Sequence, residues 1–138
     1  MKLAVAMSGG VDSAVAAGLL KREGHEVIGF FMHLNLPAEQ AATTERRCCS
    51  ADDARDAQRC ADVLGIDFYA LPYREHFQKI VKGFIESYRE GLTPYPCVQC
   101  NQDLKFGALL GLADRIGADA VATGHHARLR EGRLLRAA

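Results

Sequence analysis

A serine- and glycine-rich segment near the N-terminus is the first feature of the sequence that could do chemistry. It reads Ser8-Gly9-Gly10-Val11-Asp12-Ser13 and lies between a short apolar run and an Ala- and Leu-rich stretch. Glycines let the backbone approach a ligand closely, and unpaired N–H groups at a helix start attract anions such as phosphate. The Gly-Lys-Ser/Thr of a Walker loop is absent, which argues against ordinary γ-phosphoryl transfer. We expect a phosphate-binding turn rather than a plain Gly-rich turn, with Asp12 binding Mg²⁺ or orienting the loop.

Two cysteines three residues apart, Cys97 and Cys100, form the second chemical feature. Cys100 is predicted to stand at the start of a helix, where backbone N–H groups would stabilise a thiolate. A Cys-x-x-Cys pair can also hold zinc or an iron–sulfur cluster, although either centre usually takes three or four protein ligands. The remaining cysteines, Cys48, Cys49 and Cys60, could contribute only if their segment folded over the site. Structural or loop roles are the simpler interpretation for those three.

Other polar residues have both a functional and a purely structural interpretation. His125 and His126 follow Gly124 at the predicted end of a strand, where contact with a nucleotide is favoured over direct catalysis. Lys105 either meets phosphate or is a solvated helix charge. Arginines gather near the end of the chain and either contact an RNA backbone or belong to a solvated hairpin: Arg128, Arg130, Arg133 and Arg136.

The order of the surrounding elements explains how these residues could meet. Strands are predicted from the apolar runs at 2–6, 27–32, 68–71 and 119–123. Helices are predicted over 11–22, 50–64, about 77–88 and 101–116, and a hairpin over 128–135 turns at Glu131-Gly132. Alternating strands and helices form a parallel, doubly wound α/β sheet. The loops at Ser8, Met32 and Gly124 directly follow strands, so they should lie at the carboxyl edge where such sheets bind ligands.

Two connecting segments are predicted to be irregular. Residues 33–47 contain Pro37 and Thr43-Thr44 and are typical of a mobile loop. The segment Thr93-Pro94-Tyr95-Pro96-Cys97 has two prolines, which fix the backbone and remove hydrogen-bond donors. We expect a rigid, exposed elbow there, followed by the helix that starts near Asn101.

Composition restricts the class of protein. The chain has 138 residues, 49% of them hydrophobic, and its 17 Lys plus Arg balance 17 Asp plus Glu. These values indicate one globular domain and exclude a disordered or fibrous chain. No apolar run reaches the roughly 18 residues that a membrane helix needs, and no signal peptide is evident. An odd count of five cysteines fits a reducing compartment, so we expect a cytoplasmic protein without a membrane partner.

Three segments together resemble a known family. Ser8 to Ser13 looks like the pyrophosphate loop (PP-loop) of the ATP pyrophosphatases, which cleave ATP to AMP and pyrophosphate while adenylating a substrate. Two further segments narrow the resemblance to the tRNA-specific 2-thiouridylase family, called MnmA in bacteria. One is Thr93-Pro94-Tyr95-Pro96-Cys97-Val98-Gln99-Cys100-Asn101 with Lys105-Phe106, and the other is Thr123-Gly124-His125-His126-Ala127-Arg128. It implies that residues 1–138 form an adenine nucleotide alpha hydrolase-like, PP-loop ATP-binding catalytic domain, without the family's tRNA-binding and C-terminal β domains.

The resemblance also implies a transferase reaction and roles for individual residues. Using ATP and Mg²⁺, the wobble uridine of tRNA (position 34) would be adenylated at its C2 oxygen, and sulfur from a cysteine persulfide would then give 2-thiouridine. Cys100 matches the family's catalytic cysteine, and Tyr95, Pro96 and Cys97 match the stretch that contacts the target base. The nucleotide would be held by Ala6, Met7, Ser8, Gly9, Gly10, Val11, Asp12, Ser13, Met32 and Gly124.

The chain departs from the family's pattern at two positions. Tyr95 stands where Asn is usual, and Cys97 stands where many members carry Asp. The family's second cysteine, which carries the persulfide, belongs to a later part of the protein, and a sulfur-donor protein is an expected partner. A [4Fe–4S] cluster held by Cys97, Cys100 and one further cysteine is an open alternative. Rival functions are an amide-forming ligase of the wider ATP pyrophosphatase group, against which the segment ending in Cys100-Asn101 speaks, and a non-catalytic nucleotide-binding module.

Overall fold

The computed structural model describes residues 1–33 and 51–136, and four parallel strands form its centre. They are β1 (Lys2–Ala6), β2 (Glu26–His33), β3 (Asp67–Pro72) and β4 (Ala120–Thr123). The order across the sheet is β3-β2-β1-β4, with β2 and β4 both parallel to β1. The chain thus runs outward from β1 to β3 and returns to the other side of β1. This confirms the predicted doubly wound sheet and places its switch point at the carboxyl ends of β1 and β4.

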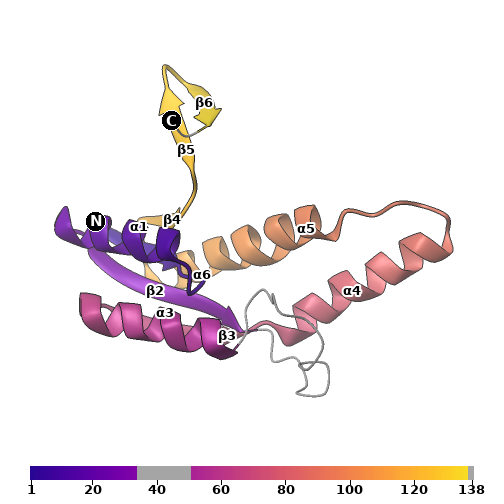
Figure 1. Ribbon diagram of the computed structural model, residues 1–138, viewed down its shortest axis with the longest axis horizontal. Coiled ribbons are helices and arrows are strands. Elements are labelled where there is room, and N and C mark those ends of the chain that lie inside the picture. Colours follow the sequence, from indigo (N-terminus) through magenta and orange to yellow (C-terminus); the bar gives the residue numbers. More distant parts are fainter. Residues whose placement is uncertain (34–50, 137–138) are drawn as a thin grey trace.

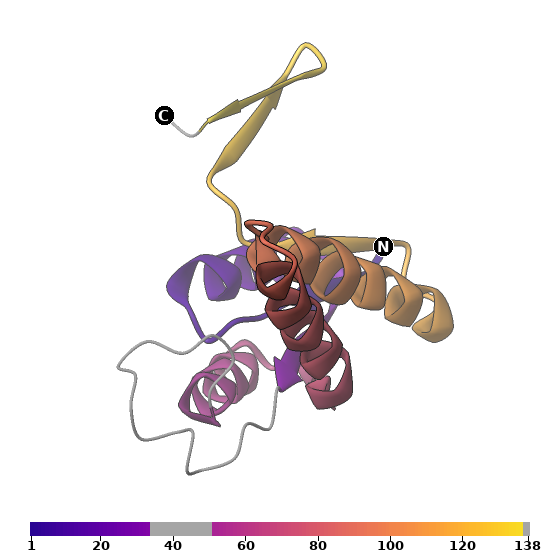
Figure 2. The ribbon, with the colours of Figure 1, turned by 90° about the vertical axis from the view of Figure 1, so that its right-hand side faces the viewer.

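Helices cover both faces of this sheet because the strands bury side chains on both faces (Figures 1 and 2). On one face, Val27 and Phe31 of β2 pack against α1 (Val11–Arg22) and α3 (Ala51–Leu64). On the other face, Ile28 and Phe30 pack against α6 (Ala108–Ile116). Alternate residues of one strand therefore supply two separate cores, as the two-residue repeat of a strand requires.

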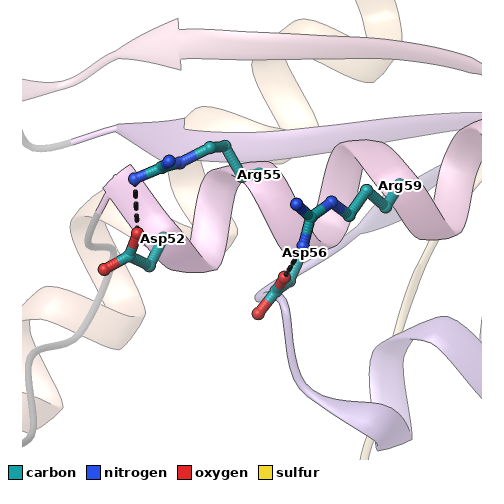
Figure 3. A network of polar contacts seen from close by, with 4 residues as sticks. All are labelled: Asp52, Arg55, Asp56 and Arg59. Atoms are coloured by element: carbon teal, nitrogen blue, oxygen red, sulfur yellow. Dashed lines mark hydrogen bonds and ion pairs between the residues drawn. The ribbon is translucent and has the colours of Figure 1, made fainter.

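Two salt bridges lie on the exposed side of α3 (Figure 3). The residues that α3 buries are small. Arg55 pairs with Asp52, and Arg59 lies 3.3 Å from Asp56. Such exposed pairs contribute only a few tenths of a kcal/mol each. Ala57 and Ala61 are fully buried and let α3 lie close to the sheet. The Lys21 side chain also donates to the carbonyls of Leu64 and Gly65, which ties α1 to the end of α3.

Two helical segments extend beyond the sheet and are called the two arms. One arm is α4 (Arg74–Arg89); the other is the helix formed by α5 (Pro96–Gln99) and η1 (Cys100–Gly107), which continues directly into α6. Residues 90–95 connect the two arms, and Figure 2 shows the arms side by side. Their contact is a small core in which buried Ile80 and Leu104 pack with Phe77, Met32 and Cys100.

The helix that carries Cys100 starts earlier than predicted. Its first residue is Pro96, not Asn101, because proline is well tolerated at the first helical position, where its missing N–H would be unpaired anyway. The predicted elbow is therefore limited to residues 93–95. The N–H of Cys100 is already bonded to the carbonyl of Pro96, so the prediction that Cys100 stands at a helix start is wrong. Cys97 occupies the first turn instead, and η1 continues as a wider, π-helical segment of the kind often found at functional sites.

The last described elements form the predicted hairpin, which consists of β5 (Ala127–Arg130) and β6 (Arg133–Arg136). It stands away from the central sheet in both views (Figures 1 and 2). Among the described residues, no helix is both long enough and apolar enough to cross a membrane. An irregular loop is predicted over 33–47. All of it except His33 lies outside the described part of the chain, as do Cys48 and Cys49.

Candidate functional site

The glycine-rich loop between β1 and α1 is folded around the side chain of Ser13. This serine is 5% exposed, and its hydroxyl accepts the N–H of Ser8 at 3.1 Å and donates to the carbonyl of Gly10 at 3.0 Å. Helix α1 begins after Gly10 without a hydrogen bond from a capping side chain. The first N–H groups of α1 are therefore left without a side-chain cap at the carboxyl end of β1, and such groups can bind an anion.

Two glycines allow neighbouring elements to close on this loop. At Gly9, φ is +79°, and a Cβ atom would lie 2.5 Å from the carbonyl oxygen of Asp53 in the first turn of α3. At Gly124, which follows β4, a Cβ would lie 2.6 Å from the backbone nitrogen of Ser13. Real Cβ atoms essentially never approach backbone so closely. The loop is thus held between α3 and the end of β4, and only glycine fits at both positions.

A cavity of about 500 Å³ opens over the loop at the switch point of the sheet. We call it the loop cavity. Most of the predicted nucleotide-binding residues line it: Ala6, Met7, Ser8, Gly9, Gly10, Ser13, Met32 and Gly124. Val11 and Asp12 do not. Val11 is 72% exposed, and the Asp12 carboxylate lies 3.2 Å from Nε2 of His126. The volume falls in the range of small-molecule and cofactor sites.

The rest of the lining of the loop cavity comes from residues that the sequence interpretation left open or missed. Lys105 and His125, which had two interpretations each, both line it. The His125 ring stacks on Phe106 with centroids 6.2 Å apart, and its Nδ1 lies 2.7 Å from the Thr123 hydroxyl. The residues that were missed are Asp53, Asn101, Phe106, Leu109 and Thr123.

For part of this lining, the sequence contained a spacing pattern from which the residues could have been predicted. Asn101, Lys105 and Leu109 recur every four residues, which places them on one face of the predicted helix. Asp53 carried no such signal, because it reaches the loop only through the packing of α3 against Gly9.

A second cavity, of about 380 Å³, lies between α4 and the helix of α5 and η1. We call it the thiol cavity, because Cys97 and Cys100 both line it. Its other walls are mostly apolar: Phe77, Ile80, Val81, Phe84, Pro96 and Leu104. Of the three residues predicted to contact a base, Pro96 and Cys97 line this cavity, whereas Tyr95 does not and is 73% exposed.

The two cavities adjoin. Met32, Asn101 and Lys105 line both of them, so a group bound over the glycine-rich loop would lie next to the thiols. The arrangement therefore brings the glycine-rich loop, the cationic side chain of Lys105 and two thiols to one edge of the sheet.

The donor set of the site fits some metal centres better than others. In the described part of the chain, no three His, Cys, Asp or Glu side chains gather to hold a metal ion. Cys97 and Cys100 are one or two ligands short of an iron–sulfur cluster, so these residues do not support one. Mg²⁺ usually takes one or two carboxylates plus the phosphates of its substrate. Asp53 in the wall of the loop cavity and Asp12 beside the loop fit that requirement.

Comparison with known sequences gives consistent matches. A family model described as "tRNA methyl transferase HUP domain" matches residues 1–137. The tRNA-specific 2-thiouridylase MnmA of Mycobacteroides abscessus is 51% identical over 138 residues, which are 99% of this chain and 39% of that protein. The protein of the same name from Mycobacterium tuberculosis is 52% identical, again over 99% of this chain and 38% of its own length. The chain thus spans about two fifths of the length of these relatives.

Solved structures support the fold. An NH₃-dependent NAD synthetase from Campylobacter jejuni has a TM-score of 0.62 at 17% identity, with 90% of this chain and 47% of that chain covered. A predicted subunit of a tRNA methyltransferase from Methanocaldococcus jannaschii has a TM-score of 0.61 at 22% identity, with coverage of 98% and 58%. At these identities the likeness concerns the fold alone.

Proposed function

The chain belongs to the tRNA methyl transferase HUP domain family, and from this premise we propose that it is the ATP-using catalytic part of a tRNA 2-thiouridylase. The proposed reaction adenylates the C2 oxygen of the wobble uridine (position 34) and replaces that oxygen with sulfur. The observation that carries the proposal is the junction of the loop cavity with the thiol cavity at Met32, Asn101 and Lys105. A reaction that needs ATP phosphates and a thiol beside one substrate atom requires such a junction.

In the first step, ATP occupies the loop cavity. The N–H groups at the start of α1 hold the β- and γ-phosphates, and Lys105 contacts the phosphate nearest the thiol cavity. Mg²⁺ held by Asp53 or Asp12 would neutralise phosphate charge. The C2 oxygen of the uridine attacks the α-phosphorus, the bond to the β-phosphate oxygen breaks, and pyrophosphate leaves. The uridine oxygen has then become part of a leaving group.

In the second step, sulfur replaces that leaving group. The uracil ring lies in the thiol cavity, whose apolar walls exclude water from the activated carbon. The terminal sulfur of a cysteine persulfide bonds to C2, and AMP departs with the original oxygen. The thiolate of Cys100 attacks the inner sulfur of the persulfide, so the S–S bond breaks, 2-thiouridine is released and a protein disulfide forms. The persulfide forms on the family's second cysteine, which becomes the disulfide partner of Cys100, and a sulfur-donor protein supplies its terminal sulfur.

Thiolation is favoured over methyl transfer, although the family description contains the words methyl transferase. The curated relatives at 51% and 52% identity are named thiouridylases. Methyl transfer does not require a thiol beside an ATP phosphate site, whereas thiolation needs a sulfur nucleophile at that place, and the thiol cavity adjoins the loop cavity.

The test uses the longest natural form of the chain with α-labelled ATP, unmodified tRNA and a persulfide donor. We expect AMP that depends on tRNA, and 2-thiouridine in the nucleoside digest. Cys100→Ser should abolish 2-thiouridine and leave ATP affinity within about twofold, because the thiol lies outside the loop cavity. Cys60→Ser is the matched control. Cys60 lies on α3 and packs among residues of α1 and α3, away from both cavities, so this variant should retain full activity. Bound ATP that stays intact with tRNA, or a Cys100→Ser variant with full thiolation, contradicts the proposal.

A further inference from the structure

The hairpin of β5 and β6 is the described feature that the catalytic proposal does not use. All eight residues of its strands are exposed, and the hairpin projects away from the sheet (Figures 1 and 2). Its two-residue turn has positive φ at both positions, 52° at Glu131 and 74° at Gly132, which is the geometry of a tight type I′ hairpin. The direction of each side chain is therefore fixed by the strand register.

One face of the hairpin carries three arginines. Arg128 pairs with Leu135, and Arg130 pairs with Arg133. Directly paired residues share a face, as do residues two apart along a strand, so Arg128, Arg130 and Arg133 lie together. We call this the arginine face. Arg136 points to the opposite face, which it shares with Ala127, Leu129 and Leu134.

The arginine face lowers the stability of the hairpin. Like charges directly opposite each other, as Arg130 and Arg133 are, destabilise a strand pair. A two-stranded hairpin is marginally stable to begin with. The ion pair of Arg130 with Glu131, at 3.9 Å between exposed groups, offsets little. Among the described residues, no carboxylate forms an ion pair with Arg128 or Arg133. This arrangement favours an external anion as the neutralising partner.

The base of the hairpin lies at the candidate site. β5 begins three residues after Gly124, whose backbone packs against Asp12 and Ser13 of the glycine-rich loop. An RNA whose base enters the thiol cavity would carry its flanking backbone past this edge of the sheet. Guanidinium groups bind phosphates through paired N–H donors, and a row of them suits a chain of phosphates.

We propose that the arginine face binds the phosphate backbone of the RNA substrate; the inference rests on the proposed function and adds a second contact surface to it. The binding is independent of sequence, because phosphates carry no base identity. It positions the RNA relative to the two cavities and has no part in bond making or breaking.

The experiment measures the affinity of the full-length protein for unmodified tRNA at several salt concentrations. The test variant is Arg128→Gln, Arg130→Gln and Arg133→Gln combined, which removes charge and keeps side-chain length. We expect the slope of log affinity against log salt to fall by about 2 to 3, since each lost phosphate contact removes roughly one. Affinity at low salt should fall at least about tenfold, and equally for tRNAs of unrelated sequence.

Two controls make the result specific. Arg136→Gln removes the same charge from the opposite face of the same hairpin and should leave the slope unchanged. A thermal midpoint equal to that of the wild type shows that the triple variant is folded, and single Gln variants, each expected to lower the slope by about one, replace it if it is not. If the wild type thiolates tRNA and the folded triple variant keeps the wild-type slope, the arginine-face proposal alone is overturned. A wild type that neither binds nor thiolates tRNA overturns the proposed function instead.

Discussion

At Gly9 the backbone has no room for a side chain. The positive φ of 79° strains any L-residue, and a Cβ would also lie 2.5 Å from the carbonyl oxygen of Asp53. Gly9→Ala should therefore lower the free energy of unfolding by about 1–3 kcal/mol and displace the loop that is proposed to hold the phosphates. We expect ATP affinity to fall at least about tenfold, since a shift of 1.4 kcal/mol already suffices for that. Calorimetric titration with ATP and urea unfolding check the two effects.

A substitution at Gly24 distinguishes the effect of backbone strain from the effect of the steric clash with Asp53 at Gly9. Its φ is +87°, but a Cβ there would meet nothing within 4 Å. Gly24→Ala should therefore cost about 1–2 kcal/mol of stability through backbone strain and leave ATP binding unchanged. Equal losses of ATP affinity in the two variants would show that contact between the loop and α3 is irrelevant to the site.

Leu104 of η1 packs against α4. It is 3% exposed and packs with Ile80 of α4. Both residues line the thiol cavity, which lies between the two helices. Leu104→Ala should lower the free energy of unfolding by about 2–5 kcal/mol, because it leaves a void that the two helices cannot fill. Leu110→Ala, on the same continuous helix but 55% exposed, should cost less than about 1 kcal/mol. Urea unfolding of both variants decides; a mild effect of Leu104→Ala would mean that the arms are held together elsewhere.

The sequence predicted the elements better than their ends. The four strands were recognisable because their apolar runs are bounded by Gly and polar residues, and Ser8 and Gly124 could be assigned to the site because they follow strands. The start of the helix at Pro96 was missed, since proline breaks a helix interior but also opens a helix. Asp53 could not be found from local pattern, because its approach to Gly9 results from tertiary packing.

The candidate site depends on the strand order of the sheet. β1 and β4 are neighbours in the sheet although more than a hundred residues separate them in sequence. Their carboxyl ends deliver the glycine-rich loop and Gly124 to the same point, and the helix of η1 and α6 adds part of the lining of the loop cavity. Binding of ATP should therefore stabilise the fold as a unit, by about 2.7 kcal/mol when ATP is present at a hundred times its dissociation constant.

Gly124 tests this coupling between the sheet and the loop. A Cβ at this position would lie 2.6 Å from backbone atoms of both Asp12 and Ser13, so Gly124→Ala must push the end of β4 away from the start of α1. We expect the variant to fold with a lower thermal midpoint and to lose most of the further rise that ATP gives the wild type. Gly111→Ala is the matched control, because a Cβ on this exposed turn of α6 meets nothing within 4 Å and alanine favours the helix. Thermal unfolding with and without ATP measures both variants. If Gly124→Ala keeps the full ATP-dependent rise, the nucleotide does not bind between the ends of β1 and β4, and the loop cavity is not its site.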